Sequence, residues 1–119
     1  MNEIEFIDYS DFFNKKIKAY QILFDKSLES LTLEKFRKHI IDKLSIDINY
    51  IAIPNQIHSN KIKWVNSNGC FNNTDGLITK NKKIILSLRT ADCIPIFLYD
   101  QKYNIKGLVH SGWRGTKDK

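Results

Sequence analysis

The hydrophobic pattern of this chain changes period near residue 46, and this change constrains the fold more than any other feature. Upstream, apolar residues recur every three or four positions, as they do along one side of a helix. The spacing predicts a helix over residues 33–44, with Thr32 as its N-cap. Downstream, apolar residues alternate with a period of two from Ile46 to Ile53, which predicts a strand that ends at Pro54.

The rest of the chain is rich in strand-like segments. We expect the other strands at residues 16–24, 61–65, 84–88, 94–99 and 105–109, with a polar loop at 66–73 and a turn at 100–104. The run 84–88 is almost continuously apolar, which is typical of a strand covered on both faces. A short helical region followed by many strands predicts an α+β architecture.

Length and composition narrow the function classes. A chain of 119 residues fits one domain, residues 1–119. No apolar run is long enough to cross a bilayer, and the acidic N-terminal segment does not resemble a secretory signal, so we expect a cytoplasmic protein with no membrane partner. The net charge of +6 comes mostly from scattered lysines, which favours a solvated surface over a nucleic-acid site.

Three segments combine residues that carry chemistry, and each follows a predicted strand. They are Gln56-Ile57-His58, Arg89-Thr90-Ala91-Asp92-Cys93 and His110-Ser111-Gly112-Trp113-Arg114-Gly115. Side chains at the ends of neighbouring strands can meet at one rim of a sheet.

His58, Cys93 and His110 form a set of two imidazoles and one thiol. This set suits a catalytic Zn²⁺ site whose fourth position is left to water. The spacings match no short structural zinc motif, and buried structural roles account for the same residues. Cys93 would then be a small core residue, and His110 would bond a buried carbonyl.

The same atoms also fit a cysteine hydrolase. Cys93 would be the nucleophile, His110 the base, and Asp92 or Gln56 the orienting or oxyanion-binding group. Sequence spacing does not separate this hypothesis from the zinc hypothesis, because both chemistries bring a thiolate close to an imidazole.

Several neighbouring residues receive simpler interpretations. Arg89 and Arg114 add anion-binding capacity near the proposed rim. Asp75, in the sequence Thr74-Asp75-Gly76, is interpreted first as a turn residue. Cys70 is interpreted as an unpaired thiol without a role.

Taken in order, these segments and Thr74-Asp75-Gly76-Leu77-Ile78-Thr79 resemble the successive motifs of the polyphenol oxidase/laccase-domain family over roughly residues 50–115. The resemblance implies a purine nucleoside phosphorylase with adenosine deaminase and methylthioadenosine phosphorylase activities. It also implies that His58, Cys93 and His110 are the catalytic zinc ligands. We accordingly expect Arg89, Asp92 and Arg114 to bind substrate. The implied fold is an α-β-β-α layered sandwich, and the implied ligands are adenosine, inosine, methylthioadenosine and phosphate.

This sequence also departs from the family pattern. Family members carry a Gly-Gly-Val-Ser-type loop and a Gly-Asp-Asp segment before the first histidine, and residues 21–38 contain neither. Members also continue well beyond the last motif, so we expect this chain to be the N-terminal part of a longer, apparently truncated fold. A copper laccase would need ligands that three histidines and one methionine do not provide. The alternative from another class is a degenerate, non-enzymatic remnant or a partner-binding half, whose exposed strand edges would favour self-association.

Overall fold

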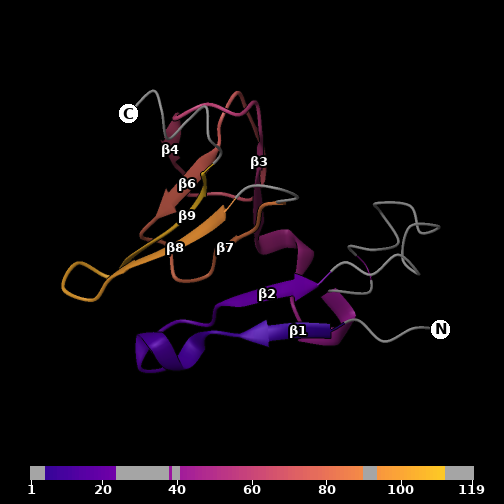
Figure 1. The fold of residues 1–119 in the computed structure, drawn as a ribbon, viewed down its shortest axis with the longest axis vertical. Coiled ribbons are helices and arrows are strands. Elements are labelled where there is room, and N and C mark those ends of the chain that lie inside the picture. Colours follow the sequence, from indigo (N-terminus) through magenta and orange to yellow (C-terminus); the bar gives the residue numbers. More distant parts are fainter. Residues whose placement is uncertain (1–4, 24–37, 39–40, 90–93, 112–119) are drawn as a thin grey trace. The chain divides into compact units, whose positions relative to one another are not determined.

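The computed structural model describes residues 5–23, 38, 41–89 and 94–111. It shows a mixed, sheet-rich chain with a helix, in agreement with the mixed α and β class expected from the sequence. The chain divides into two compact units, residues 1–48 and 49–119 (Figure 1). None of the helical segments that the structure describes has the length and apolar character needed to cross a membrane.

The first unit contains an antiparallel strand pair, formed by β1 (Glu5–Asp8) and β2 (Tyr20–Leu23). The short 3-10 helix η1 (Ser10–Phe13) lies in the connection between them. Only β2 corresponds to the strand expected over residues 16–24, and β1 was not predicted. The expected strand begins too early because its first residue still belongs to a turn. Asn14 and Lys15 have positive φ angles of 52° and 57°, and the amide of Lys16 donates to the carbonyl of Phe13 at 2.9 Å.

The helix ends at Leu44, as the sequence predicts. Lys38 and residues 41–44 are helical, whereas Thr32, His39 and the rest of the expected helix lie outside the described residues. Ser45 takes the left-handed conformation, with a φ of 55°, and the amide of Ile46 donates to the carbonyl of Ile41 at 3.0 Å. This six-residue closure is a Schellman cap, which satisfies a carbonyl that the helix end would otherwise leave unpaired.

In the second unit, three parallel strands form one sheet in the order β5-β3-β7. These strands are β3 (Ile51–Asn55), β5 (Gly69–Asn72) and β7 (Ile85–Leu86). The polar loop predicted at 66–73 therefore contains a strand. The strand predicted at 84–88 is reduced to two half-buried residues, so it is not covered on both faces as expected.

The strand predicted at 46–53 is shifted toward the C-terminus. Residues Ile48–Tyr50 form the 3-10 helix η3, and Pro54 lies inside β3 rather than beyond its end. Ala52 accepts a hydrogen bond from Ser87 on the β7 side, so Pro54, two residues later, also directs its nitrogen to that side. Because β7 pairs only with Ile51 and Ala52, no ladder bond is lost at this proline among the described residues.

A four-stranded mixed sheet has the order β4-β6-β9-β8. Its strands are β4 (Ile62–Trp64), β6 (Gly76–Thr79), β8 (Ile94–Asp100) and β9 (Ile105–Ser111). The strands and the turn expected from residue 94 to 109 are confirmed, and they form the β8–β9 hairpin, orange to yellow in Figure 1. The strand β6, which was not predicted, pairs with β4 on one side and with β9 on the other.

The buried core of this unit draws side chains from both sheets. Ala52, Val65, Leu77 and Ile84 form one buried cluster, against which Phe71 and Leu86 pack. Burial of this cluster joins β3 to β6. It thereby holds the residues that follow β3 close to those that precede β6, where the candidate site lies.

Candidate functional site

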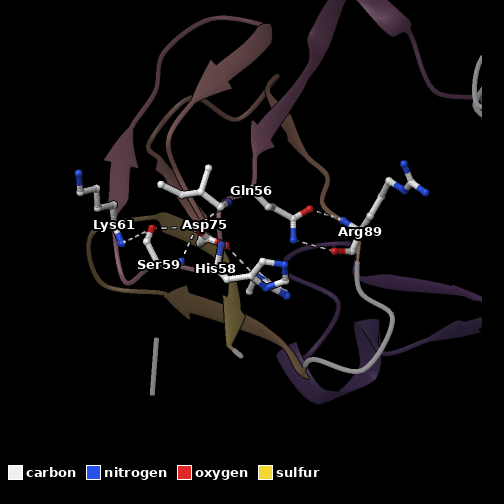
Figure 2. A network of polar contacts seen from close by, with 8 residues as sticks. Gln56, His58, Ser59, Lys61, Asp75 and Arg89 are labelled. Atoms are coloured by element: carbon white, nitrogen blue, oxygen red, sulfur yellow. Dashed lines mark hydrogen bonds and ion pairs between the residues drawn. The ribbon is translucent and has the colours of Figure 1, made fainter. Parts of the chain in front are cut away.

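The candidate site forms where three segments meet at one end of the two sheets (Figure 2). His58 follows β3, Asp75 immediately precedes β6, and His110 lies near the end of β9. Pairing of β6 with β9 brings Asp75 beside His110, and the amide of His110 donates to the Asp75 carbonyl at 2.7 Å. The sequence prediction that His58 and His110 lie near the same rim agrees with this arrangement.

The carboxylate of Asp75 is the centre of the network. Its Oδ1 accepts hydrogen bonds from the amides of Ile57 (3.1 Å) and Ser59 (2.8 Å) and from the Ser59 hydroxyl (2.8 Å). Its Oδ2 accepts from the amide of His58 at 3.0 Å and lies 2.9 Å from Nδ1 of His110. Asp75 is only 1% exposed, so these donors replace the water that it loses on burial.

Three successive amides converge on one carboxylate because the backbone turns at His58, whose φ is +60°. Successive N–H groups around a left-handed residue form a concave anion-binding nest. A non-glycine residue in this region carries a small conformational cost. Charge-assisted hydrogen bonds to Asp75 offset that cost and fix the segment that carries His58.

Burial acts to raise the pKa of Asp75, but hydrogen bonds from Ser59, His110 and Ile57 outweigh it and lower this pKa to about 2. The carboxylate is therefore ionised near neutral pH and only accepts hydrogen bonds. It follows that Nδ1 of His110 carries the hydrogen in this contact. His110 itself is only 4% exposed.

The rings of His58 and His110 lie edge to face, with centroids 5.4 Å apart. Two imidazoles bound to one tetrahedral zinc ion, with Zn–N distances near 2 Å, have centroids about 5 Å apart. Because Asp75 occupies Nδ1 of His110, Nε2 is the nitrogen left to bind a metal. The separation of the two rings is therefore of the size expected for two ligands of one zinc ion.

A second contact braces the segment that follows β7. The side-chain amide of Gln56 donates from Nε2 to the Arg89 carbonyl at 2.7 Å, and its Oε1 accepts from the Arg89 amide at 3.1 Å. The Gln56 side chain thus makes the same pair of hydrogen bonds to Arg89 that the backbone of a neighbouring strand would make. Figure 2 shows the Arg89 side chain extending away from His58, so in this structure Arg89 contacts Gln56 through its backbone.

Three of the predicted site residues, Asp92, Cys93 and Arg114, lie outside the described residues. Cys70, the other cysteine, is exposed on β5. Within residues 41–89 and 94–111, no group of three or more histidine, cysteine or acidic side chains is arranged to hold a metal ion. The described part of the chain therefore supplies two of the three predicted ligands.

The sequence interpretation missed the role of Asp75, which is a buried hydrogen-bond acceptor and not only a turn residue. The available sequence signal was its position directly before Gly76 and the apolar residues Leu77 and Ile78. An aspartate that enters a buried strand needs several donors, whereas a turn aspartate is normally solvated. The cysteine-hydrolase hypothesis gives Gln56 an orienting or oxyanion-binding role, whereas both ends of its side-chain amide contact the Arg89 backbone.

A family model described as multi-copper polyphenol oxidoreductase laccase matches residues 27–119. The chain belongs to this family. Among curated relatives, it is 32% identical over 92 residues to purine nucleoside phosphorylase YlmD of Bacillus subtilis, covering 69% of this chain and 33% of the relative. It is 30% identical over 84 residues to adenosine deaminase RL5 of an unknown prokaryotic organism, covering 62% of this chain and 32% of that protein.

The comparison with solved structures finds a similar fold over the matched part. The crystal structure of the Bacillus licheniformis hypothetical protein YfiH has a TM-score of 0.64 and 30% identity, covering 69% of this chain and 34% of that structure. The chain thus spans about a third of the length of each of these three proteins.

Proposed function

We propose that the chain carries the metal-binding part of a zinc-dependent purine nucleoside phosphorylase that also deaminates adenosine. The observation that carries this proposal is the His58–His110 pair, whose rings lie 5.4 Å apart while Asp75 occupies Nδ1 of His110. The names of the relatives supply the substrate class, since one is a purine nucleoside phosphorylase and another an adenosine deaminase.

His58 and His110, together with Cys93, would hold the zinc ion. When bound, zinc supplies Lewis-acid activation of water or of a phosphate oxygen. The chain's own residues set the access to this ion. His110 is buried and His58 is exposed, so substrate reaches the pair from the His58 side.

The two proposed reactions differ in the bond that breaks. In phosphorolysis of inosine, a phosphate oxygen bonds to C1′ of the ribose, the N9–C1′ bond breaks, and hypoxanthine leaves with a proton on nitrogen. In deamination of adenosine, the oxygen of water bonds to C6 and ammonia leaves. We propose that Arg89, Asp92 and Arg114 bind the substrate or phosphate, since arginine binds phosphate oxygens through paired donors.

The test is an assay of the purified chain with inosine, in the presence and absence of phosphate, and with adenosine. We expect hypoxanthine only when phosphate is present, inosine and ammonia from adenosine, and loss of both activities in His58→Ala. The matched control is His39→Ala, which changes the one histidine outside the proposed ligand set. Turnover that persists unchanged in His58→Ala would contradict the proposal.

The same preparation separates zinc chemistry from a cysteine hydrolase. A thiolate bound to zinc is shielded, so we expect alkylation of Cys93 to become fast only after a chelator has removed the metal. A cysteine hydrolase would show the opposite pattern. Alkylation would abolish its activity directly, and chelators would leave that activity intact.

A second candidate function is self-association, favoured by exposed apolar side chains on β4 and β8, the edge strands of the four-stranded sheet in the described part. Trp64 is 57% exposed, Ile94 67% and Leu98 46%. The pairing register places them on one face of the sheet, which a second copy of the chain would cover.

Light scattering of the purified chain tests for such a dimer. We expect Trp64→Lys to weaken a dimer and Tyr103→Lys, in the hairpin turn, to leave it intact. A wild-type monomer at all concentrations would contradict it.

A further inference from the structure

We propose that Asp75 is the positioning residue of the site, because its single carboxylate sets the placement of both histidine ligands. This inference rests on the proposed zinc site. It assigns to Asp75 a role in orienting the ligands, and it does not place Asp75 on the metal or the substrate. Figure 2 shows the contacts that meet at this residue.

The first step concerns the ring of His110. Its Nδ1 lies 2.9 Å from Oδ2 of Asp75, and both side chains are almost completely buried. A carboxylate that accepts from Nδ1 keeps the hydrogen on that atom and leaves the lone pair on Nε2. It also stops rotation of the ring about its Cβ–Cγ bond, so Nε2 keeps one direction. Metal-binding histidines depend on such partners for their tautomer and orientation.

The second step concerns His58, which Asp75 holds through the backbone. The amides of Ile57, His58 and Ser59 all donate to the same carboxylate. The position of the His58 Cα therefore depends on Asp75, although the His58 ring itself is exposed. Two proposed ligands that are 52 residues apart in the sequence are thus positioned by one buried group.

The third step concerns the rigidity of Asp75 itself. Its amide donates to the Lys61 carbonyl at 2.9 Å, and its carbonyl accepts from the amide of His110 at 2.7 Å. Ser59 adds a link, because its hydroxyl donates to Asp75 and accepts from the Lys61 amide at 3.2 Å. Both the backbone and the side chain of Asp75 are therefore fixed. Asp75 can accordingly hold both histidines against small displacements.

The test compares wild type with Asp75→Asn, which keeps the size of the side chain but replaces an acceptor oxygen with a donor NH₂. Long-range ¹H–¹⁵N NMR of the imidazole rings in the metal-free chain at about pH 8 reports which nitrogen of His110 carries the hydrogen. We expect hydrogen on Nδ1 and a bare Nε2 in wild type, and a shift toward hydrogen on Nε2 in Asp75→Asn. We also expect Asp75→Asn to weaken zinc binding about 10- to 100-fold in a competition titration with a chromophoric chelator.

Ser59→Ala is the matched control, since it removes one hydroxyl contact to Asp75 and leaves the contact to His110 in place. We expect it to keep the wild-type tautomer. A wild-type ring with hydrogen on Nε2 alone would overturn the proposal, and this measurement needs no variant to fold. An unchanged tautomer and unchanged zinc affinity in Asp75→Asn would also overturn it. Failure of wild type to bind zinc would contradict the proposed function, while the tautomer would still test the positioning role.

Discussion

Nδ1 of His110 lies 2.9 Å from Oδ2 of Asp75, and the two side chains are only 3% and 1% exposed. A carboxylate in such surroundings stays ionised only because several donors replace its hydration. Here the donors come from residues 57–59 and from His110, so the buried charge links the end of β3 to β9. The stability of this part of the chain and the proposed zinc chemistry therefore depend on the same group.

The first prediction concerns stability against acid. The folded-state pKa of Asp75, about 2, lies below the ordinary value of 3.8. A lowered pKa contributes stability above the unfolded value, and that contribution is lost as pH falls through the folded value. The difference between these two pKa values corresponds to about 2 kcal/mol of unfolding free energy. Of this, about 1 kcal/mol is lost between about pH 6 and pH 3. Urea unfolding of the metal-free chain across this range measures it.

Other carboxylates also titrate in this range, so Asp75→Asn serves as the reference. We expect the difference in unfolding free energy between wild type and Asp75→Asn to shrink as the solution is acidified. If the two stability curves stay parallel from pH 6 to pH 3, Asp75 does not have the depressed pKa argued above.

The second prediction compares two glycines in neighbouring strands, Gly76 in β6 and Gly107 in β9. A Cβ at Gly76 would lie 3.1 Å from Cγ2 of Val109 and 3.2 Å from Cγ1 of Ile62, whereas a Cβ at Gly107 meets nothing closer than 3.5 Å. Alanine reduces the freedom of the unfolded chain at both sites, so the comparison isolates crowding. We expect Gly76→Ala to be less stable than Gly107→Ala by about 1 kcal/mol. Equal unfolding midpoints of the two variants would show that the side chains of Val109 and Ile62 move aside without measurable cost.

The third prediction concerns the Gln56–Arg89 brace. Gln56→Ala removes the acceptor of the Arg89 amide and the donor to the Arg89 carbonyl. A hydrogen bond of this kind contributes about 1 kcal/mol, so we expect exchange of the Arg89 amide hydrogen to accelerate about fivefold. The amide of Ser87, which donates to Ala52 at 3.0 Å, is the internal control. Equal acceleration at Ser87 would indicate general loosening of the sheet and not loss of this brace.

Sequence patterns predicted those elements whose cause is local. The helix ends at Leu44 because Ser45 and Ile46 form its cap, and the β8–β9 hairpin follows from two apolar runs around a turn. The errors arose where pairing overrides local pattern. Gly69–Asn72 lies in the asparagine-rich segment 66–73, which resembles a loop, yet it forms β5 because β3 offers it a parallel partner. Pro54 lies inside β3 for a similar reason, since its missing donor faces no partner among the described strands.

The site was predictable only in part. Imidazole and thiol side chains are recognisable in a sequence, and His58 and His110 do lie beside each other. The residue that joins them was not recognisable in the same way, because aspartate before glycine is common in turns. Its function depends on burial and on amides supplied by residues 57–59, and both follow from strand pairing.

We propose that His58, Cys93 and His110 form one zinc site, and metal analysis of purified variants is the strictest test of that site. The chain offers matched controls, because it has one further histidine, His39, and one further cysteine, Cys70. After expression with ample zinc, we predict one zinc ion per chain in wild type, His39→Ala and Cys70→Ala, and loss of the metal in His58→Ala, Cys93→Ala and His110→Ala. A zinc-free wild type, or zinc that is retained in Cys93→Ala and lost in Cys70→Ala, would show that these three residues do not form a zinc site.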